Sequence, residues 1–136
     1  MLPAYAGCEL LMIYGTGVDL VSIPRMERVI LRWEERFVSR VFTRQEIRFC
    51  RQRPVPHAAF ALRFAAKEAF SKALGLGMRQ GIRWLDIAVR HEPSGKPKLD
   101  LTGSSLEICQ KNGITNVHVS LSDDGEYGVA MVVLEQ

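Results

Sequence analysis

The sequence predicts an α+β domain. The first observation is the order of the segments: a strand, three helices, a pair of strands, a helix and a last pair of strands. The second is that strands and helices do not alternate along the chain, as they would in a doubly wound fold. The 136 residues, 47% of them hydrophobic and 24% charged, are enough for one domain with its own core.

The chain opens with a strand and a capped helix. Residues 13–20 are mainly β-branched, small or glycine, which predicts a buried strand that carries Asp19 near its end. Ser22 is a preferred N-cap residue and Pro24 suits the first turn of a helix, so a helix is expected to follow directly. The segment 37–42 is apolar, but its pattern assigns it to no particular element.

Two further helices are predicted before the first hairpin. Thr43 and Glu46 have the spacing of a capping box, so a short helix is expected to begin at about residue 44. It is expected to end before Pro54, because proline cannot continue a helix. The main helix is expected to begin near His57 and to end at the glycines of 75–77.

The second half of the chain is predicted to hold two hairpins with a helix between them. Alternating apolar residues and turn-forming residues mark the hairpins, and a second capping pattern marks the helix. The first hairpin is expected to have strands 84–90 and 98–101 around a turn at 92–97. The helix is expected to open at Ser104–Glu107 and to close at Gly113. The second hairpin is expected to have strands 117–122 and 127–134 around Asp123–Gly125.

Composition excludes several classes of protein. A net charge of +3 fits a phosphate-bearing or acidic partner, but it equally fits an ordinary cationic surface. Cys8, Cys50 and Cys109 have no metal-ligand spacing and are odd in number, so we expect reduced thiols. No apolar run approaches the ~20 residues of a membrane span, and no basic leader is present. We therefore expect a cytoplasmic protein that neither enters membranes nor carries zinc.

The N-terminal segment 1–11 is expected to lie outside the domain. Met12 begins a stretch that reads as a complete first strand, which suggests that it is the true start of the protein. The predicted domain is therefore 12–136, without an internal linker or repeat.

The main helix has a polar half and an alanine half. At 100° per residue, Arg63, Lys67, Glu68 and Lys72 share one half with Ser71. The opposite half carries mostly alanines, which let a neighbouring backbone approach closely. Taken alone, Glu68 and Lys72 are also explained as a solvated i,i+4 ion pair worth about 0.2–0.5 kcal/mol. The aromatic residues Phe60 and Phe64 lie within the polar half, where they serve either as core or as a docking spot.

Combining Glu68 with Asp19 changes the interpretation. Two carboxylates, one at a strand end and one on a buried helix, suit Mg²⁺, which takes one or two carboxylates and completes its shell with water and substrate phosphate. Arg63, Lys67 and Lys72 on the same helix would then bind phosphates. The implied chemistry is transfer or cleavage at a phosphate ester.

The sequence resembles the small bacterial 4′-phosphopantetheinyl transferases, the holo-acyl-carrier-protein synthases. The resemblance runs in order from Met12 nearly to the end of the chain, and its most specific parts are the G-x-G-x-D segment and the main helix. The matching stretches read MIYGTGVDLVSIPRMERV, FTRQE, RFAAKEAFSKALGLGMRQGIRWLDIAV, SGKPKLDLTG and VHVSLSDDGEYGVAMVV.

The resemblance implies a Mg²⁺-dependent reaction at coenzyme A. A serine hydroxyl of apo acyl carrier protein attacks the β-phosphate, takes up phosphopantetheine and releases adenosine 3′,5′-bisphosphate. The family assembles as a homotrimer with active sites between subunits. No role in nucleic-acid binding is expected, because the chain lacks any signature of it. The alternative is a regulator of the same fold that binds coenzyme A or a nucleotide without catalysis.

The resemblance also assigns roles to individual residues. Asp19 and Glu68 match metal ligands, and Lys72 matches a lysine that meets the phosphates and can act as a proton donor. The expected coenzyme A contacts are Arg63, Lys72, Gly75, Gly77, Gly95, Lys96 and Pro97. The residues that fall where the family docks its acidic carrier protein are Arg25, Arg32, Arg36 and Phe64.

One position departs from the family pattern. Asp123 stands where some members have histidine, so a histidine role cannot be carried over to this chain. His118 lies within the predicted strand and is expected to be structural. The group that deprotonates the serine stays open among a metal-bound water, Glu68 and Asp123.

Overall fold

The computed structural model describes residues 11–78 and 80–136 and has the predicted α+β architecture. Nearly all of the expected extension 1–11 lies outside the described residues. The elements follow in the order β1 (Ile13–Ser22), α1 (Ile23–Trp33), α2 (Glu35–Val41), α3 (Arg44–Arg51), α4 (Pro56–Ala73), a 3₁₀ turn η1 (Trp84–Asp86), β2 (Ile87–His91), β3 (Pro97–Leu101), α5 (Gly103–Lys111), β4 (Asn116–Asp124) and β5 (Tyr127–Glu135).

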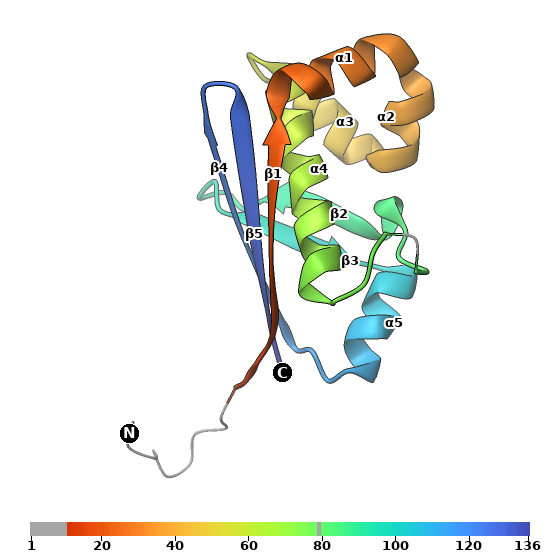
Figure 1. The fold of residues 1–136 in the computed structure, drawn as a ribbon, viewed down its shortest axis with the longest axis vertical. Coiled ribbons are helices and arrows are strands. Elements are labelled where there is room, and N and C mark those ends of the chain that lie inside the picture. Colours follow the sequence, from red (N-terminus) through yellow and green to blue (C-terminus); the bar gives the residue numbers. More distant parts are fainter. Residues whose placement is uncertain (1–10, 79) are drawn as a thin grey trace.

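Two antiparallel sheets flank the central helix α4. The larger sheet has the strand order β1-β5-β4, and β2 pairs with β3 in a separate hairpin. Figure 1 shows α4 lying against the larger sheet, with α1, α2 and α3 gathered at one end and α5 at the other. Both predicted hairpins are confirmed, with Arg90 opposite Lys98 in one and Asp123 opposite Gly128 in the other.

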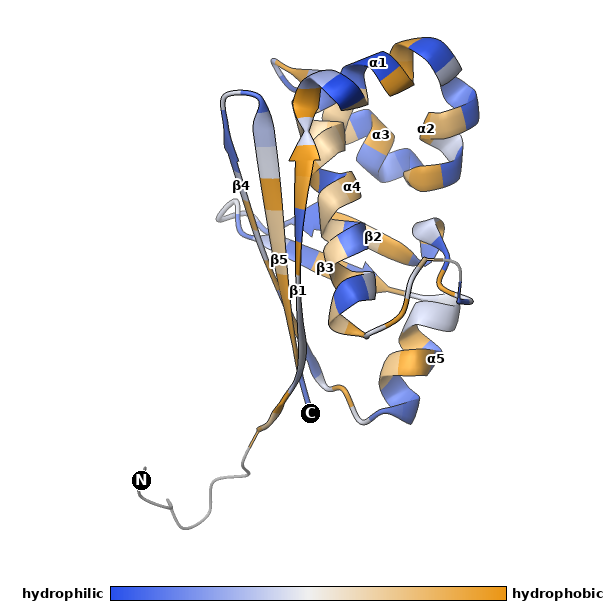
Figure 2. Ribbon diagram, in the orientation of Figure 1, coloured by the Kyte–Doolittle hydropathy of each residue, from blue (hydrophilic) through white to orange (hydrophobic). Residues whose placement is uncertain are grey.

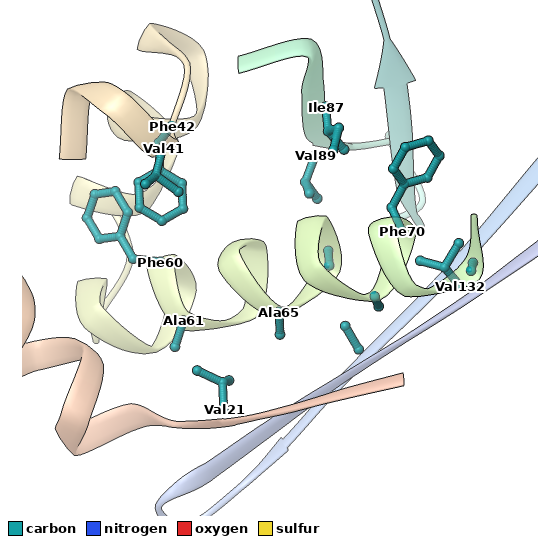
Figure 3. Packing of buried hydrophobic residues seen from close by; sticks show 14 of the residues in the cluster. Val21, Val41, Phe42, Phe60, Ala61, Ala65, Phe70, Ile87, Val89 and Val132 are labelled. Carbon is teal, nitrogen blue, oxygen red and sulfur yellow. The ribbon is translucent and has the colours of Figure 1, made fainter. Parts of the chain in front are cut away.

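The core lies between α4 and the elements around it. Figure 3 shows Val21 of β1 against Ala61 and Ala65 on one side of α4, and Ile87 and Val89 of β2 on the other side. The inner residues of β5 are apolar as well, which Figure 2 shows as warm colours along the sheet. Since both sides of α4 are covered, this helix is the central element that the alanine pattern predicted.

Two of the predicted helix caps are present. The Arg25 N–H donates to Ser22 Oγ at 3.3 Å at the start of α1. At the start of α3, the Glu46 N–H donates to Thr43 Oγ1 at 3.2 Å, and the Thr43 N–H donates to Glu46 Oε1 at 2.9 Å. This reciprocal pair is the predicted capping box.

Two local predictions were wrong, and one segment without an assignment forms an additional helix. The apolar segment 37–42 belongs largely to an extra helix, α2, which a sharp turn at Glu34 (φ 46°) separates from α1. The expected strand 84–90 begins only at Ile87, because residues 84–86 form the 3₁₀ turn. At α5 the pattern Ser104–Glu107 forms no capping box. Instead, Asp86 Oδ2 accepts from the Ser104 N–H at 3.2 Å and from Ser104 Oγ at 3.0 Å, so a distant carboxylate caps this helix.

Candidate active site

Two glycines bring β1 into close contact with α4. A Cβ on Gly15 would lie 2.1 Å from the Ala73 carbonyl oxygen, and one on Gly17 would lie 1.9 Å from that of Ala69. No side chain fits at either position, and the small alanines opposite allow the same approach from the helix. The backbone contact that the alanine face predicted is therefore made with β1.

Asp19 follows Gly17 at the strand period of two, so its side chain is on the α4 side of the sheet. Lys72 of α4 reaches it there, with its Nζ 3.0 Å from Asp19 Oδ1 and 3.1 Å from the Val18 carbonyl oxygen. The Asp19 side chain is 15% exposed and that of Lys72 is 52% exposed. The ammonium group therefore lies at the edge of the site, with room to move toward a ligand.

Asp19 and Glu68 line one pocket of about 590 Å³, called here the carboxylate pocket. Burial raises the pKa of the Glu68 carboxyl, and the negative charge of Asp19 raises it further, although Lys72 opposes this effect. The Asp19 carboxylate is thus close enough to disfavour ionisation of Glu68. The other residues that line the pocket are Leu20, Val21, Ser22, Arg25, Met26, Val29, Phe37, Phe64 and Tyr127.

The donor set of the carboxylate pocket fits Mg²⁺. Asp19 and Glu68 offer hard oxygen ligands, and a divalent cation would offset the negative charge of Asp19 that now disfavours ionisation of Glu68. Across the described residues there is no cluster of three or more histidine, cysteine or acidic side chains that could hold a metal ion. Two carboxylates are nevertheless enough for Mg²⁺, because water and substrate phosphates complete its shell.

Arg63 occupies a second pocket, of about 370 Å³, called here the arginine pocket. Its side chain is almost fully buried, and its Nε is a buried donor with no partner. The guanidinium lies 4.2 Å from the centre of the Phe49 ring, and Nη2 lies 3.2 Å from His91 Nδ1. The remaining lining residues are Arg53, Pro54, Val55, Ala58, Ala59, Leu62, Gly95, Pro97, Leu121 and Asp123.

A buried cation of this kind indicates a site for an anion. Arg63 forms no ion pair with a carboxylate among the described residues, and its only other hydrogen bond is a long one of 3.5 Å to the Ala59 carbonyl. An unpaired buried charge is costly, so the free donors of Arg63 are best explained by a phosphate or another anion that they bind.

The two pockets are separate within one chain. They share no lining residue, and Arg63 and Glu68 are five positions apart on α4, which places them about 140° apart around the helix axis. A ligand that touches both sets of residues must therefore be long, or must bridge two copies of the chain.

The structure contradicts the expectation that Lys67 binds phosphate. Lys67 is fully buried, and its Nζ donates to the Val41 carbonyl at 2.5 Å, to Glu46 Oε1 at 2.7 Å and to the Trp84 carbonyl at 3.1 Å. Glu46 Oε2 in turn accepts from the Val89 N–H at 3.0 Å. All three ammonium protons are used, so Lys67 has none left for a ligand and instead ties four elements to α4.

The expected coenzyme A residues outside α4 are only partly brought together. Gly95, which has a positive φ of 90°, and Pro97 line the arginine pocket, whereas Lys96 between them does not. Gly75 and Gly77 follow the end of α4 and line neither pocket, and Gly75 has a positive φ of 76°.

The expected docking residues lie along α1, α2 and the exposed side of α4. Arg25 and Phe64 line the carboxylate pocket, and Arg36 lines an adjacent groove beside Trp33. The guanidinium of Arg32 lies 5.1 Å from the centre of the Trp33 ring. Phe64 is only partly buried, because it stacks on Trp84 at 5.1 Å while one side faces the pocket. All four side chains are thus on or next to one continuous surface.

Three residues of the arginine pocket were missed by sequence reasoning. Phe49 and His91 stack with ring centres 5.1 Å apart, and Arg53 lies 5.5 Å from the Phe49 ring centre. The available signal was the position of His91 directly before the Glu92–Pro97 turn. Asp123 also lines this pocket, whereas His118 contacts Glu135 on the neighbouring strand and lines neither pocket.

Comparisons with known proteins agree with this arrangement. A family model described as the 4′-phosphopantetheinyl transferase superfamily matches residues 15–132. The holo-[acyl-carrier-protein] synthase of Syntrophus aciditrophicus is 48% identical over 124 residues, which are 91% of this chain and 97% of that protein. The protein of the same name from Geobacter sulfurreducens is 45% identical over 125 residues, or 92% of this chain and 99% of that one.

Solved structures give the same result. The crystal structure of the Neisseria meningitidis holo-[acyl-carrier-protein] synthase is similar with a TM-score of 0.84 and 37% identity, and the match covers 92% of this chain and 100% of that one. The Helicobacter pylori protein of that name, solved in complex with coenzyme A, has a TM-score of 0.78 and 32% identity, over 88% of this chain and 98% of that one.

Proposed function

The chain belongs to the 4′-phosphopantetheinyl transferase superfamily, and from this premise we propose that it transfers 4′-phosphopantetheine from coenzyme A to a serine of apo acyl carrier protein. The names of its relatives support this activity, and so does the coenzyme A bound to a similar structure. The observation that carries the proposal is that Asp19 from a strand and Glu68 from a helix line one pocket, with Lys72 bonded to Asp19 beside it.

Asp19 and Glu68 would hold Mg²⁺. When bound there, Mg²⁺ supplies Lewis-acid polarisation of a phosphate and charge neutralisation. The chain contributes two carboxylates on rigid elements, and the close packing of Gly15 and Gly17 on α4 fixes the position of Asp19 relative to Glu68.

The proposed reaction is a displacement at the β-phosphorus of coenzyme A. A bond forms between the serine oxygen and that phosphorus, the bond to the oxygen that bridges the two phosphates breaks, and adenosine 3′,5′-bisphosphate leaves. Lys72 is well placed to meet the negative charge that develops on the leaving group, because its ammonium is half exposed and reaches the pocket edge. The candidate bases for the serine proton that this chain supplies are Glu68, which lines the carboxylate pocket, and Asp123, which lines the arginine pocket.

The arginine pocket would bind the nucleotide part of coenzyme A. Arg63 supplies a buried, unpaired donor for a phosphate, Gly95 and Pro97 line the pocket, and the exposed Lys96 between them would contact the ligand from outside. Gly75 and Gly77 would contact the same substrate from the end of α4.

A homotrimer with active sites between subunits would unite the two pockets. In one chain Arg63 and Glu68 face different pockets, and a neighbouring copy would bring the two pockets to one molecule of coenzyme A. The outer face of the larger sheet supports this assembly, because Val18, Leu20 and Met131 on it are about half or more exposed. An exposed apolar sheet face of this kind is typical of a subunit interface.

The acidic carrier protein would dock on the surface formed by Arg25, Arg32, Arg36 and Phe64. This surface adjoins the carboxylate pocket, so a docked carrier would present its serine close to Asp19 and Glu68. The arginines are exposed and therefore expected to speed encounter more than they tighten binding, an effect that salt would weaken.

The test is intact-mass spectrometry of apo acyl carrier protein after incubation with this protein, coenzyme A and Mg²⁺, with a parallel sample in EDTA. A gain of one phosphopantetheine, about 340 Da, only in the sample with metal is the expected result. Binding of coenzyme A without any gain in mass would instead favour the inactive regulator, and no binding at all would contradict both functions.

A further inference from the structure

His91 has a contact that no motif assigns to it. Arg63 Nη2 lies 3.2 Å from His91 Nδ1, and a guanidinium has donors but no acceptor. His91 Nδ1 must therefore be the acceptor, which means that it carries no proton. The neutral ring then has its single proton on Nε2, so the contact with Arg63 selects one tautomer.

The surroundings of His91 hold the ring in place and keep it neutral. Its ring stacks on Phe49 at an interplanar angle of 8°, and its backbone lies opposite Pro97 at the end of the β2–β3 hairpin. Burial lowers the pKa of the His91 imidazole, and the positive charges of Arg63 and Arg53 lower it further. The acceptor that faces Arg63 is thus both rigid and unprotonated at neutral pH.

Arg63 needs such a support. Its Nε has no partner, its bond to the Ala59 carbonyl is long, and it forms no ion pair with a carboxylate of the described residues. The Phe49 ring, 4.2 Å from the guanidinium, constrains its plane but gives no direction to its N–H groups. His91 Nδ1 is therefore the contact that orients the guanidinium within the arginine pocket.

We propose that His91 is a positioning residue, which holds the guanidinium of Arg63 in the orientation that binds a phosphate group of coenzyme A. This role rests on the proposed function, since coenzyme A is the substrate assigned to the arginine pocket. His91 acts through Arg63 and not by contact with the reacting atoms. It adds to the substrate site a residue that lies just before the Ser94–Pro97 motif.

Two substitutions of His91 separate positioning from simple packing. His91→Asn keeps an acceptor, because the Asn side-chain oxygen is separated from Cα by the same number of bonds as Nδ1 of histidine. His91→Leu keeps an apolar contact with Phe49 but has no acceptor. Calorimetric titration with coenzyme A is expected to show affinity about tenfold weaker for His91→Leu, the usual order for losing a hydrogen bond to a charged group. For His91→Asn the expected change is within about twofold. When the concentration of coenzyme A is varied, His91→Leu should raise the KM for coenzyme A, while kcat at saturation should stay nearly unchanged.

An independent readout is the protonation state of the His91 ring. Long-range ¹H–¹⁵N correlation spectra of the wild-type protein at neutral pH should show Nδ1 unprotonated and Nε2 protonated, and His91→Asn identifies the signals among the three histidines. A proton on Nδ1 would overturn the proposal. If circular dichroism shows that His91→Leu does not fold, His91→Gln is used in its place. The glutamine amide lies beyond the position of Nδ1, so this variant also lacks an acceptor at that position.

The outcomes also separate this proposal from the proposed function. If the wild-type chain binds coenzyme A and His91→Leu binds it equally well, only the role of His91 fails. If the wild-type chain binds no coenzyme A, the proposed function fails and the role of His91 fails with it. Weaker binding by His91→Leu together with near wild-type binding by His91→Asn is the result that supports the proposal.

Discussion

Lys67→Met is expected to destabilise the fold strongly, because Lys67 is a buried structural cation. Methionine keeps most of the apolar stem but removes an ammonium group that donates to three oxygens. The change leaves the Glu46 carboxylate buried without its partner. If Lys67 bound phosphate instead, the same substitution would weaken coenzyme A binding and leave stability nearly untouched.

The expected loss follows from burial of the pair. The Lys67 and Glu46 side chains are 0% and 1% exposed, so solvent screens their interaction little. Breaking a buried ion pair from one side costs about 3–5 kcal/mol. For a chain of this size that corresponds to a fall in melting temperature of roughly 10–15 °C. Since a domain has in total only about 5–15 kcal/mol of stability, Lys67→Met is expected to be near the limit of folding.

Urea unfolding followed by circular dichroism, at one fixed protein concentration, measures the loss. The double variant Lys67→Met/Glu46→Gln should recover about 2 kcal/mol or more relative to the sum of the single changes, because no unpaired charge then remains. Lys98→Met is the matched control: it breaks the exposed pair with Glu92 and should cost less than about 1 kcal/mol. A cost below about 1 kcal/mol for Lys67→Met, or strict additivity, would refute the reasoning.

Four further outcomes are expected. Asp19→Ala or Glu68→Ala should abolish transfer in the mass-spectrometric assay while size-exclusion chromatography shows an unchanged oligomer; residual transfer near the wild-type rate would contradict the metal assignment. Lys72→Met should tighten Mg²⁺ binding several-fold in calorimetry without coenzyme A, because Lys72 now neutralises Asp19 at 3.0 Å; weaker binding would argue against this competition. Arg25→Glu should raise the KM for carrier protein with little effect on kcat, and an unchanged KM would count against the docking surface. Burial raises the pKa of Cys50 to about 11, so at pH 8 only about 0.1% of this thiol is ionised. Alkylation of Cys50 by iodoacetamide should therefore be slow until the protein unfolds. Fast alkylation of the native protein would contradict the burial of this thiol.

The features that the sequence predicted well are those with a local cause. Ser22 caps α1 through its own hydroxyl, and Thr43 and Glu46 satisfy each other within one turn of α3. The alanine face of α4 was predictable from its period alone. Its partner was not, because only the packed structure places Gly15 and Gly17 of β1 against that face.

Two of the failures, at Ser104 and Lys67, have a cause that is distant in the sequence. Ser104 was expected to cap α5 with its own hydroxyl, but Asp86 from the 3₁₀ turn supplies the acceptor. Lys67 lies in the polar half of α4, yet α2, α3, the 3₁₀ turn and β2 cover that part of the helix and bury its ammonium. Helical periodicity shows which residues share a face, but it does not show what else packs on that face.

The arrangement of α4 explains why its polar residues serve two pockets. Arg63 near its middle faces the arginine pocket, Glu68 lines the carboxylate pocket, Lys72 near its end contacts Asp19 of β1, and Lys67 is tied to Glu46. A rotation of α4 would therefore disturb both pockets at once, and the buried pair opposes such a rotation. Because the separation of the pockets is built into one rigid helix, local flexibility cannot bring Arg63 to Glu68. Under the proposed chemistry, a second copy of the chain would bring one of the two pockets to the same molecule of coenzyme A, and the exposed apolar residues of the larger sheet offer a surface for that assembly.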